Sequence, residues 1–62
     1  MNALIRILAG DAKARRENSE AYIAPHSIMA EMIDPVLARK MQAVFDAQEE
    51  LDLYVLARTE SR

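Results

Sequence analysis

The chain has 62 residues, a net charge of −2, no cysteine and 52% hydrophobic residues, eleven of which are alanine. This length permits a single domain, the lack of cysteine excludes disulfides and cysteine-based zinc sites, and the apolar content is too high for a disordered chain. The acidic balance gives no general attraction to nucleic acid, and the sequence contains neither a targeting signal nor the ~18 consecutive apolar residues of a membrane span.

The N-terminal segment predicts a helix over about 2–23, because helix-forming residues dominate it and apolar residues begin it at helical spacing. Asn2 is the expected N-cap, and the polar stretch 13–20 is expected to be a solvated part of the same helix. The residues expected on the inner face are Leu4, Ile5, Ile7, Leu8, Ala12, Ala14, Ala21, Tyr22 and Ile23. The alternative is a break near Gly10, since glycine lowers helix stability and Asp11 could cap a restart.

A joint follows, bounded by the two prolines of the chain. Pro25 disfavours helical geometry in the residue before it, so the first helix should stop there. Ser27 is expected to cap a short helical turn over 27–33, which ends where Asp34 caps the next helix and Pro35 takes its first position. The methionines Met29, Met32 and Met41 are expected to fill the core, which two chains could share.

The C-terminal segment predicts a long helix over about 35–58, followed by a frayed "TESR" tail. Its apolar stripe alternates steps of four and three residues through Leu37, Met41, Val44, Gln48, Leu51 and Val55. Phe45, Tyr54 and Leu56 widen this stripe beyond a two-stranded coiled-coil seam, which favours a bundle. Gln48 has two interpretations: it specifies register across an interface, or it lies at the edge of the stripe in water.

These elements predict an all-α antiparallel helical hairpin that associates into a helical-bundle homodimer, because one hairpin cannot hide all of its apolar residues. Residues 1–24 carry a charge of +1 and residues 25–62 a charge of −3, which favours antiparallel pairing of the two halves. In architecture the chain resembles small plasmid- and phage-encoded helical-hairpin dimers. The residues expected to mediate self-association are Leu37, Met41, Val44, Leu51 and Val55, and the sequence leaves dimer and tetramer open.

Candidate chemistry is sparse. His26 is the single histidine, and catalysis would require a nucleophile and an orienting acid beside it that the sequence does not supply. Scattered carboxylates around one histidine also lack the ligand spacing of a zinc site. We therefore expect no catalytic, cofactor-binding or metal-binding residue, no cofactor and no enzymatic activity. The acidic residues expected to form a solvated face of the long helix are Asp46, Glu49, Glu50 and Asp52.

The expected function is that of a cytoplasmic, non-enzymatic adaptor or regulator that binds itself and another protein, and no membrane. The residues expected to meet such a partner are Arg15, Arg16, Asp46 and Glu50. The alternative is a nucleic-acid-binding regulator that uses the basic residues Lys13, Arg15 and Arg16. Here "GDAKARRE" (10–17) resembles the start of the arginine-rich RNA-binding helices of phage antitermination proteins, although Glu17 and Glu20 stand where those helices continue with basic residues.

Overall fold

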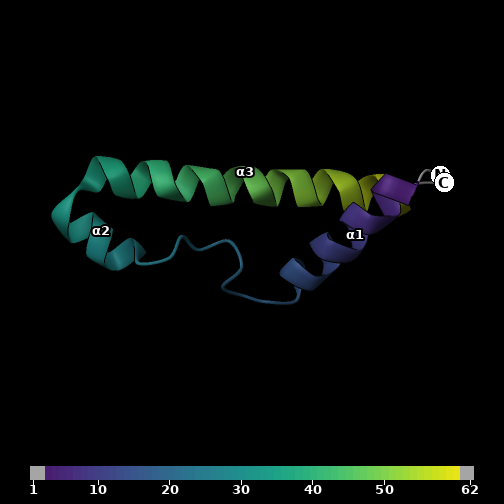
Figure 1. Cartoon of the computed structure of the whole chain (residues 1–62), viewed down its shortest axis with the longest axis horizontal. Helices are drawn as coiled ribbons and strands as arrows, with labels where there is room; N and C mark the ends of the chain where they lie inside the picture. The colour runs from purple at the N-terminus through teal and green to yellow at the C-terminus, as the bar shows by residue number, and fades with distance from the viewer. Residues whose placement is uncertain (1–2, 61–62) are drawn as a thin grey trace.

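The computed structural model describes residues 3–60, and its regular structure is entirely helical (Figure 1). Three helices follow one another along the chain: α1 (Ala3–Arg16), α2 (Ser27–Ile33) and α3 (Pro35–Glu60). They hold 81% of the described residues, and no strand occurs among them. The predicted all-α fold is confirmed. The expected cap at Asn2 and the last two residues of the predicted tail lie outside the described part of the chain.

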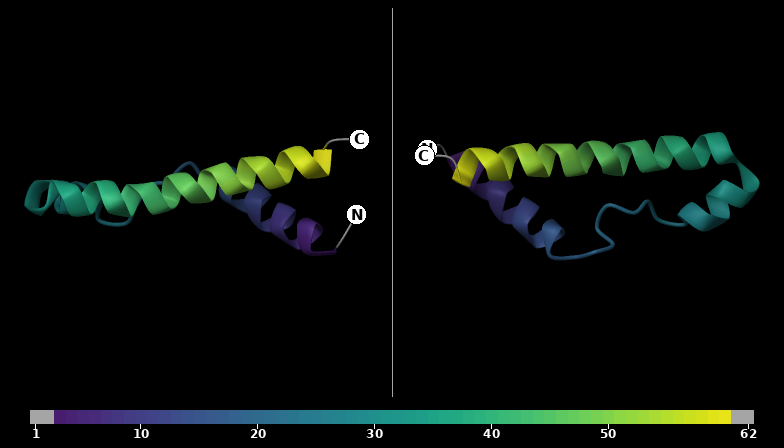
Figure 2. Two further views of the ribbon diagram at one scale, coloured as in Figure 1. Left: turned by 90° about the horizontal axis from the view of Figure 1, so that it is seen from above. Right: turned by 180° about the vertical axis from the view of Figure 1, so that it is seen from behind.

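The long helix α3 is the spine of the molecule. α1 runs antiparallel to it near its C-terminal end and α2 packs near its N-terminal end, so the two shorter helices lie along one side of the spine (Figure 1). Figure 2 shows that α1 crosses α3 at an angle, so that the start of α1 and the end of α3 lie apart from each other at the same end of the molecule. The chain measures 46 × 18 × 16 Å, and its radius of gyration is 14.2 Å. A compact domain of this length would have a radius of gyration of about 10.6 Å, so the hairpin is strongly elongated.

The first helix is shorter than predicted. It ends at Arg16 rather than near residue 23, and residues 17–26 form a series of turns. The Asn18 side chain accepts a hydrogen bond from the backbone N–H of Glu20 (3.1 Å). Such local bonds offer the backbone an alternative to helical pairing, which explains why the helix stops well before Pro25.

Within its shorter span, α1 is continuous through Gly10, so the alternative prediction of a break there is wrong. The neighbouring alanines favour helix strongly enough to tolerate one glycine. Ala12 is fully buried against α3 as predicted, whereas Ala14 is exposed. Leu4 and Ile7 are also exposed, so only part of the expected apolar face of α1 packs inside this chain.

The start of α2 differs from the prediction as well. The residue that precedes the helix is His26, which takes a left-handed conformation (φ 58°, ψ 24°) and makes no capping bond with its side chain. Its carbonyl accepts the N–H of Ala30 (2.9 Å), while Ser27 is already the first helical residue. The prediction of a Ser27 cap is therefore wrong by one residue.

α3 matches its prediction closely at the N-terminus. The Asp34 carboxylate accepts the backbone N–H of Leu37 (3.1 Å), and Pro35 is the first helical residue. At the other end the helix continues to Glu60, so Thr59 and Glu60 belong to it rather than to a frayed tail. The Thr59 hydroxyl donates to the carbonyl of Leu56 (2.9 Å) in this last turn.

The core of one chain is small, with three buried apolar residues among the described ones: Ala12, Ala24 and Val55. The predicted stripe of α3 divides between two environments. Val55 is buried and Met41 and Gln48 are half-buried, but Leu37, Val44 and Leu51 are exposed. The face of α3 that packs inside the chain is therefore displaced by about one residue from the predicted stripe. The other residues on this inner face are Ala38, Gln42, Phe45, Glu49, Asp52, Leu56 and Thr59. Met29 and Met32 are exposed, so they do not fill the core of this chain.

Candidate functional site

The centre of the inner face is a buried ion pair. Arg15, in the last turn of α1, reaches Asp52 in the middle of α3 through two parallel bonds, Nε to Oδ2 and Nη2 to Oδ1, each 2.7 Å long. Asp52 is 1% exposed, whereas 34% of the Arg15 side chain remains in contact with solvent. This two-point geometry fixes α1 against α3 in one register.

Two further side chains complete the surroundings of the Asp52 carboxylate. The Tyr22 hydroxyl donates to Oδ2 (2.5 Å), and Gln48 Nε2 donates to Oδ1 (2.9 Å) from one turn earlier on α3. Together with Arg15 these donors leave no buried side-chain polar atom without a partner among the described residues. Gln48 therefore supports a carboxylate of its own chain, which neither sequence interpretation anticipated.

The electrostatics follow from this geometry. Hydrogen bonds from Arg15 hold the pKa of the Asp52 carboxyl well below its usual range, against the opposing effect of burial. The same bond raises the pKa of the Arg15 guanidinium. Burial, followed by the bond to Asp52, raises the pKa of the Tyr22 phenol. All three groups therefore keep their ordinary neutral-pH charge states, which fits a structural cluster better than a proton-transfer site.

A second polar contact fixes the turns between α1 and α2. Gln42 on α3 donates through Nε2 to the carbonyl of Tyr22 (2.6 Å), and its Oε1 accepts the N–H of Ala24 (3.1 Å). These two bonds replace the pairing that a helix over these residues would have provided. They also place the Tyr22 ring where its hydroxyl meets Asp52.

Arg16 makes the outer counterpart of the buried pair. Its Nη1 donates to the Glu49 carboxylate (2.6 Å), and its guanidinium lies 5.5 Å from the centre of the Tyr22 ring. The hydrogen bond to Glu49 raises the pKa of Arg16. Both partners are about 40% exposed, so this pair contributes less to stability than the buried one.

The structure places the predicted partner-binding residues in two groups. Arg15 and Arg16 are engaged with carboxylates of α3 inside the chain. Asp46 and Glu50 are exposed on α3, and Asp46 accepts a bond from Gln42 (3.1 Å). The prediction that residues 46–52 form a solvated acidic face is wrong for Asp52, which is the most buried charged residue of the described chain.

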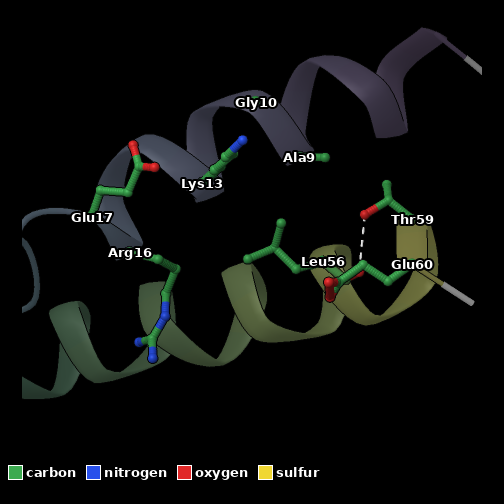
Figure 3. Close-up of a pocket in the computed structure, with 8 residues that line it drawn as sticks. All are labelled: Ala9, Gly10, Lys13, Arg16, Glu17, Leu56, Thr59 and Glu60. Carbon is green, nitrogen blue, oxygen red and sulfur yellow. Dashed lines mark hydrogen bonds between the residues drawn. The ribbon is translucent and has the colours of Figure 1, made fainter.

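Hollows lined by described residues flank the inner face, and two of them are large enough to note. One is a groove of about 500 Å³ between α1 and the last turns of α3, with Leu56 pointing toward α1 (Figure 3). Its lining residues are Ala9, Gly10, Lys13, Arg16, Glu17, Leu56, Thr59 and Glu60. The other, of about 420 Å³, lies where α2 meets the start of α3. Residues 3–60 contain no group of three His, Cys, Asp or Glu side chains that could hold a metal ion. His26 is exposed in the turn before α2.

Many large apolar side chains lie on the surface of the hairpin. Thirteen large hydrophobic side chains among residues 3–60 are exposed, and those with more than 70% exposure, Ile28, Met32 and Ile33, all belong to α2. The accessible surface of the chain is 5028 Å². A compact monomer of 7.0 kDa would expose about 4,000 Å², so this chain exposes about 1,000 Å² more than its mass requires.

No helix among residues 3–60 is long and apolar enough to cross a membrane. No protein family, curated protein or solved structure matches the chain. The candidate functional site is therefore defined by geometry alone: a polar inner cluster that holds the hairpin together, and an apolar outer surface that the hairpin leaves open.

Proposed function

We propose that this protein is a non-enzymatic adaptor or regulator that forms a helical-bundle homodimer and acts by binding another protein. The observation that carries the proposal is the exposed apolar surface of the hairpin. A soluble monomer seldom exposes contiguous apolar patches beyond a few hundred Å², whereas surfaces that meet other proteins do. The surplus of about 1,000 Å² of total accessible surface, polar and apolar together, is close to the ~800 Å² that each partner contributes to a standard interface.

The small core supports the same proposal. A chain of this size buries only ~60% of its unfolded surface, and here the buried apolar side chains among the described residues are two alanines and one valine. Association with a second copy would supply the missing burial. Of the predicted partner-binding set, Asp46 and Glu50 are the residues that stay exposed and form no ion pair among the described residues.

The nucleic-acid alternative loses support from the geometry. Of its three basic residues, Arg15 and Arg16 are neutralised by Asp52 and Glu49, and Lys13 alone has no ion pair among the described residues. Counterion release needs several cations free to meet phosphates. The alternative predicts binding of labelled duplex DNA or RNA at low salt that weakens steeply as salt is added.

Sedimentation equilibrium between about 1 and 100 µM tests the association. We expect a mass of two chains, and a folded monomer of 7.0 kDa over the whole range would contradict the proposal. For the adaptor role, a photo-crosslinking residue at exposed Asp46 in the native host should trap a discrete second protein. The matched control places the same residue at exposed Glu17, in the turns that follow α1, and equal labelling from both positions would count against a specific partner surface.

A further inference from the structure

The exposed side of α3 carries a regular heptad pattern that the inner packing does not use. The residues of this outer seam follow one another at alternating steps of three and four: Leu37, Lys40, Val44, Ala47, Leu51, Tyr54 and Arg58. All seven are exposed, with Val44 at 68% and Tyr54 at 59%. Steps of three and four mark the line along which one helix packs on another. The seam shares only Leu37, Val44 and Leu51 with the stripe predicted from sequence.

The outer seam is accessible along its whole length. α1 and α2 both pack on one side of α3 (Figures 1 and 2), and every residue of the seam, which runs beside that packed side, is exposed. From Leu37 to Arg58 the seam extends about 32 Å. The Arg58 guanidinium donates to the Tyr54 hydroxyl (3.3 Å) and lies 5.7 Å from the ring centre, so the side chains at this end are already ordered against each other.

We infer that the outer seam of α3 binds the same seam of a second copy in an antiparallel arrangement, with the two-fold axis between Val44 and Ala47. The inference rests on the proposed homodimer and specifies its interface. In this register Val44 faces Ala47 of the partner subunit, and Leu37 faces Tyr54 of the partner subunit. The small Ala47 opposite Val44 lets the two helices approach closely near the axis, and Leu37 with Tyr54 forms an apolar pair toward each end of the seam.

Charge selects this orientation over the parallel one. A parallel pair would place Lys40 against Lys40 of the partner subunit and Arg58 against Arg58 of the partner subunit, with repulsion at both ends of the seam. The antiparallel pair separates these like charges. It also places the N-terminus of each long helix beside the C-terminus of the other, so that the two helix dipoles attract each other.

Charge also selects the register. An antiparallel pair shifted by one heptad would bring Lys40 beside Arg58 of the partner subunit. In the inferred register Lys40 instead lies beside Glu50 of the partner subunit, and symmetry makes this ion pair twice. Within one chain Lys40 and Glu50 are ten residues, about 15 Å, apart on the same helix, so they cannot pair with each other.

A charge exchange tests the register in solution. Lys40→Glu should raise the dimer Kd by about tenfold, because it replaces two exposed attractions by two repulsions. Adding Glu50→Lys on the same chain should restore the wild-type Kd, since each lysine again meets a glutamate of the other copy. Arg39→Glu, an equal charge change at an exposed position outside the seam, is the control and should leave the Kd nearly unchanged. If the double variant is no tighter than Lys40→Glu alone, the register is wrong.

Cysteine pairs test the orientation, and the chain has no native cysteine to interfere. Mixing Leu37→Cys chains with Tyr54→Cys chains should give a disulfide-linked heterodimer. Neither variant should link to itself, because its two copies would lie about 25 Å apart along the helices. Self-linking of Leu37→Cys would indicate a parallel pair, and linking of Val44→Cys to Tyr54→Cys would indicate the shifted register; either result overturns the inference. If the wild-type protein is a dimer but none of these cysteine mixtures forms a disulfide, this interface is refuted and the homodimer proposal stands. If the wild-type protein is a monomer, both are refuted.

Discussion

The buried ion pair between Arg15 and Asp52 makes the sharpest prediction about stability. In Asp52→Asn the volume is kept, but the carboxylate that receives Arg15, Tyr22 and Gln48 becomes an amide whose nitrogen must face at least one of these donors. Breaking a buried pair costs about 3 to 5 kcal/mol. Because a third of the Arg15 side chain already contacts solvent and can be rehydrated, we expect the low end, about 3 kcal/mol.

That loss is large against the whole stability of a chain of this length, which typically amounts to about 3 to 9 kcal/mol. Urea unfolding followed by circular dichroism at 222 nm, at one fixed protein concentration, measures the difference. Asp46→Asn is the matched control, since it makes the same chemical change at an exposed position of the same helix and should cost less than about 0.5 kcal/mol. Equal midpoints for the two variants would show that the buried cluster does not hold the hairpin together.

Three further predictions concern pH and the backbone. Folding lowers the pKa of Asp52, so the contribution of this carboxylate to the free energy of unfolding is present above its unfolded pKa of about 3.9 and is lost as the pH falls toward its folded pKa. The difference in stability between wild type and Asp52→Asn should therefore shrink between pH 5 and pH 2, which urea titrations at each pH would measure. Gly10→Ala should raise stability by about 1 kcal/mol, because the new methyl group meets nothing within 4 Å and the helix loses a poor helix former; a lower thermal midpoint would refute this. His26→Gly should raise it by about 1 kcal/mol by relieving the left-handed backbone, whereas Ser27→Gly, one residue into α2, should lower it.

The sequence predicted helix boundaries well where a boundary depends on interactions between residues that are close together in the chain. Asp34 and Pro35 fix the start of α3 through a side-chain cap and a preset backbone angle, and both effects operate within one turn. The end of α1 was missed because the polar residues 17–20 suit a solvated helix in composition. In the structure, the hydrogen bond that the Asn18 side chain accepts from the Glu20 N–H favours a turn over a helix at these residues.

The candidate site was harder to predict because it depends on pairing across the hairpin. Asp52 belongs to an acidic run that is otherwise exposed, and its burial requires Arg15 and Tyr22 to arrive from 37 and 30 residues away. One signal was present: Gln48 and Asp52, four residues apart, are polar positions beside the apolar residues Phe45, Val55 and Leu56. The opposite charges of residues 1–24 and 25–62 are a second signal, because they favour a salt bridge between the two halves over a fully solvated acidic face on α3.

The distribution of side chains on α3 links folding to association. The central positions of its inner face are occupied by Gln42, Gln48 and Asp52. These side chains specify one register for α1 and the turns but bury little apolar area. Its outer seam carries Leu37, Val44, Leu51 and Tyr54, which could supply that area only against another molecule. A polar network of this kind selects a unique arrangement without contributing the bulk of the free energy of folding. In the proposed dimer, the polar inner face would therefore specify the fold of each hairpin, and the outer seam would supply hydrophobic stabilisation by packing against the second copy.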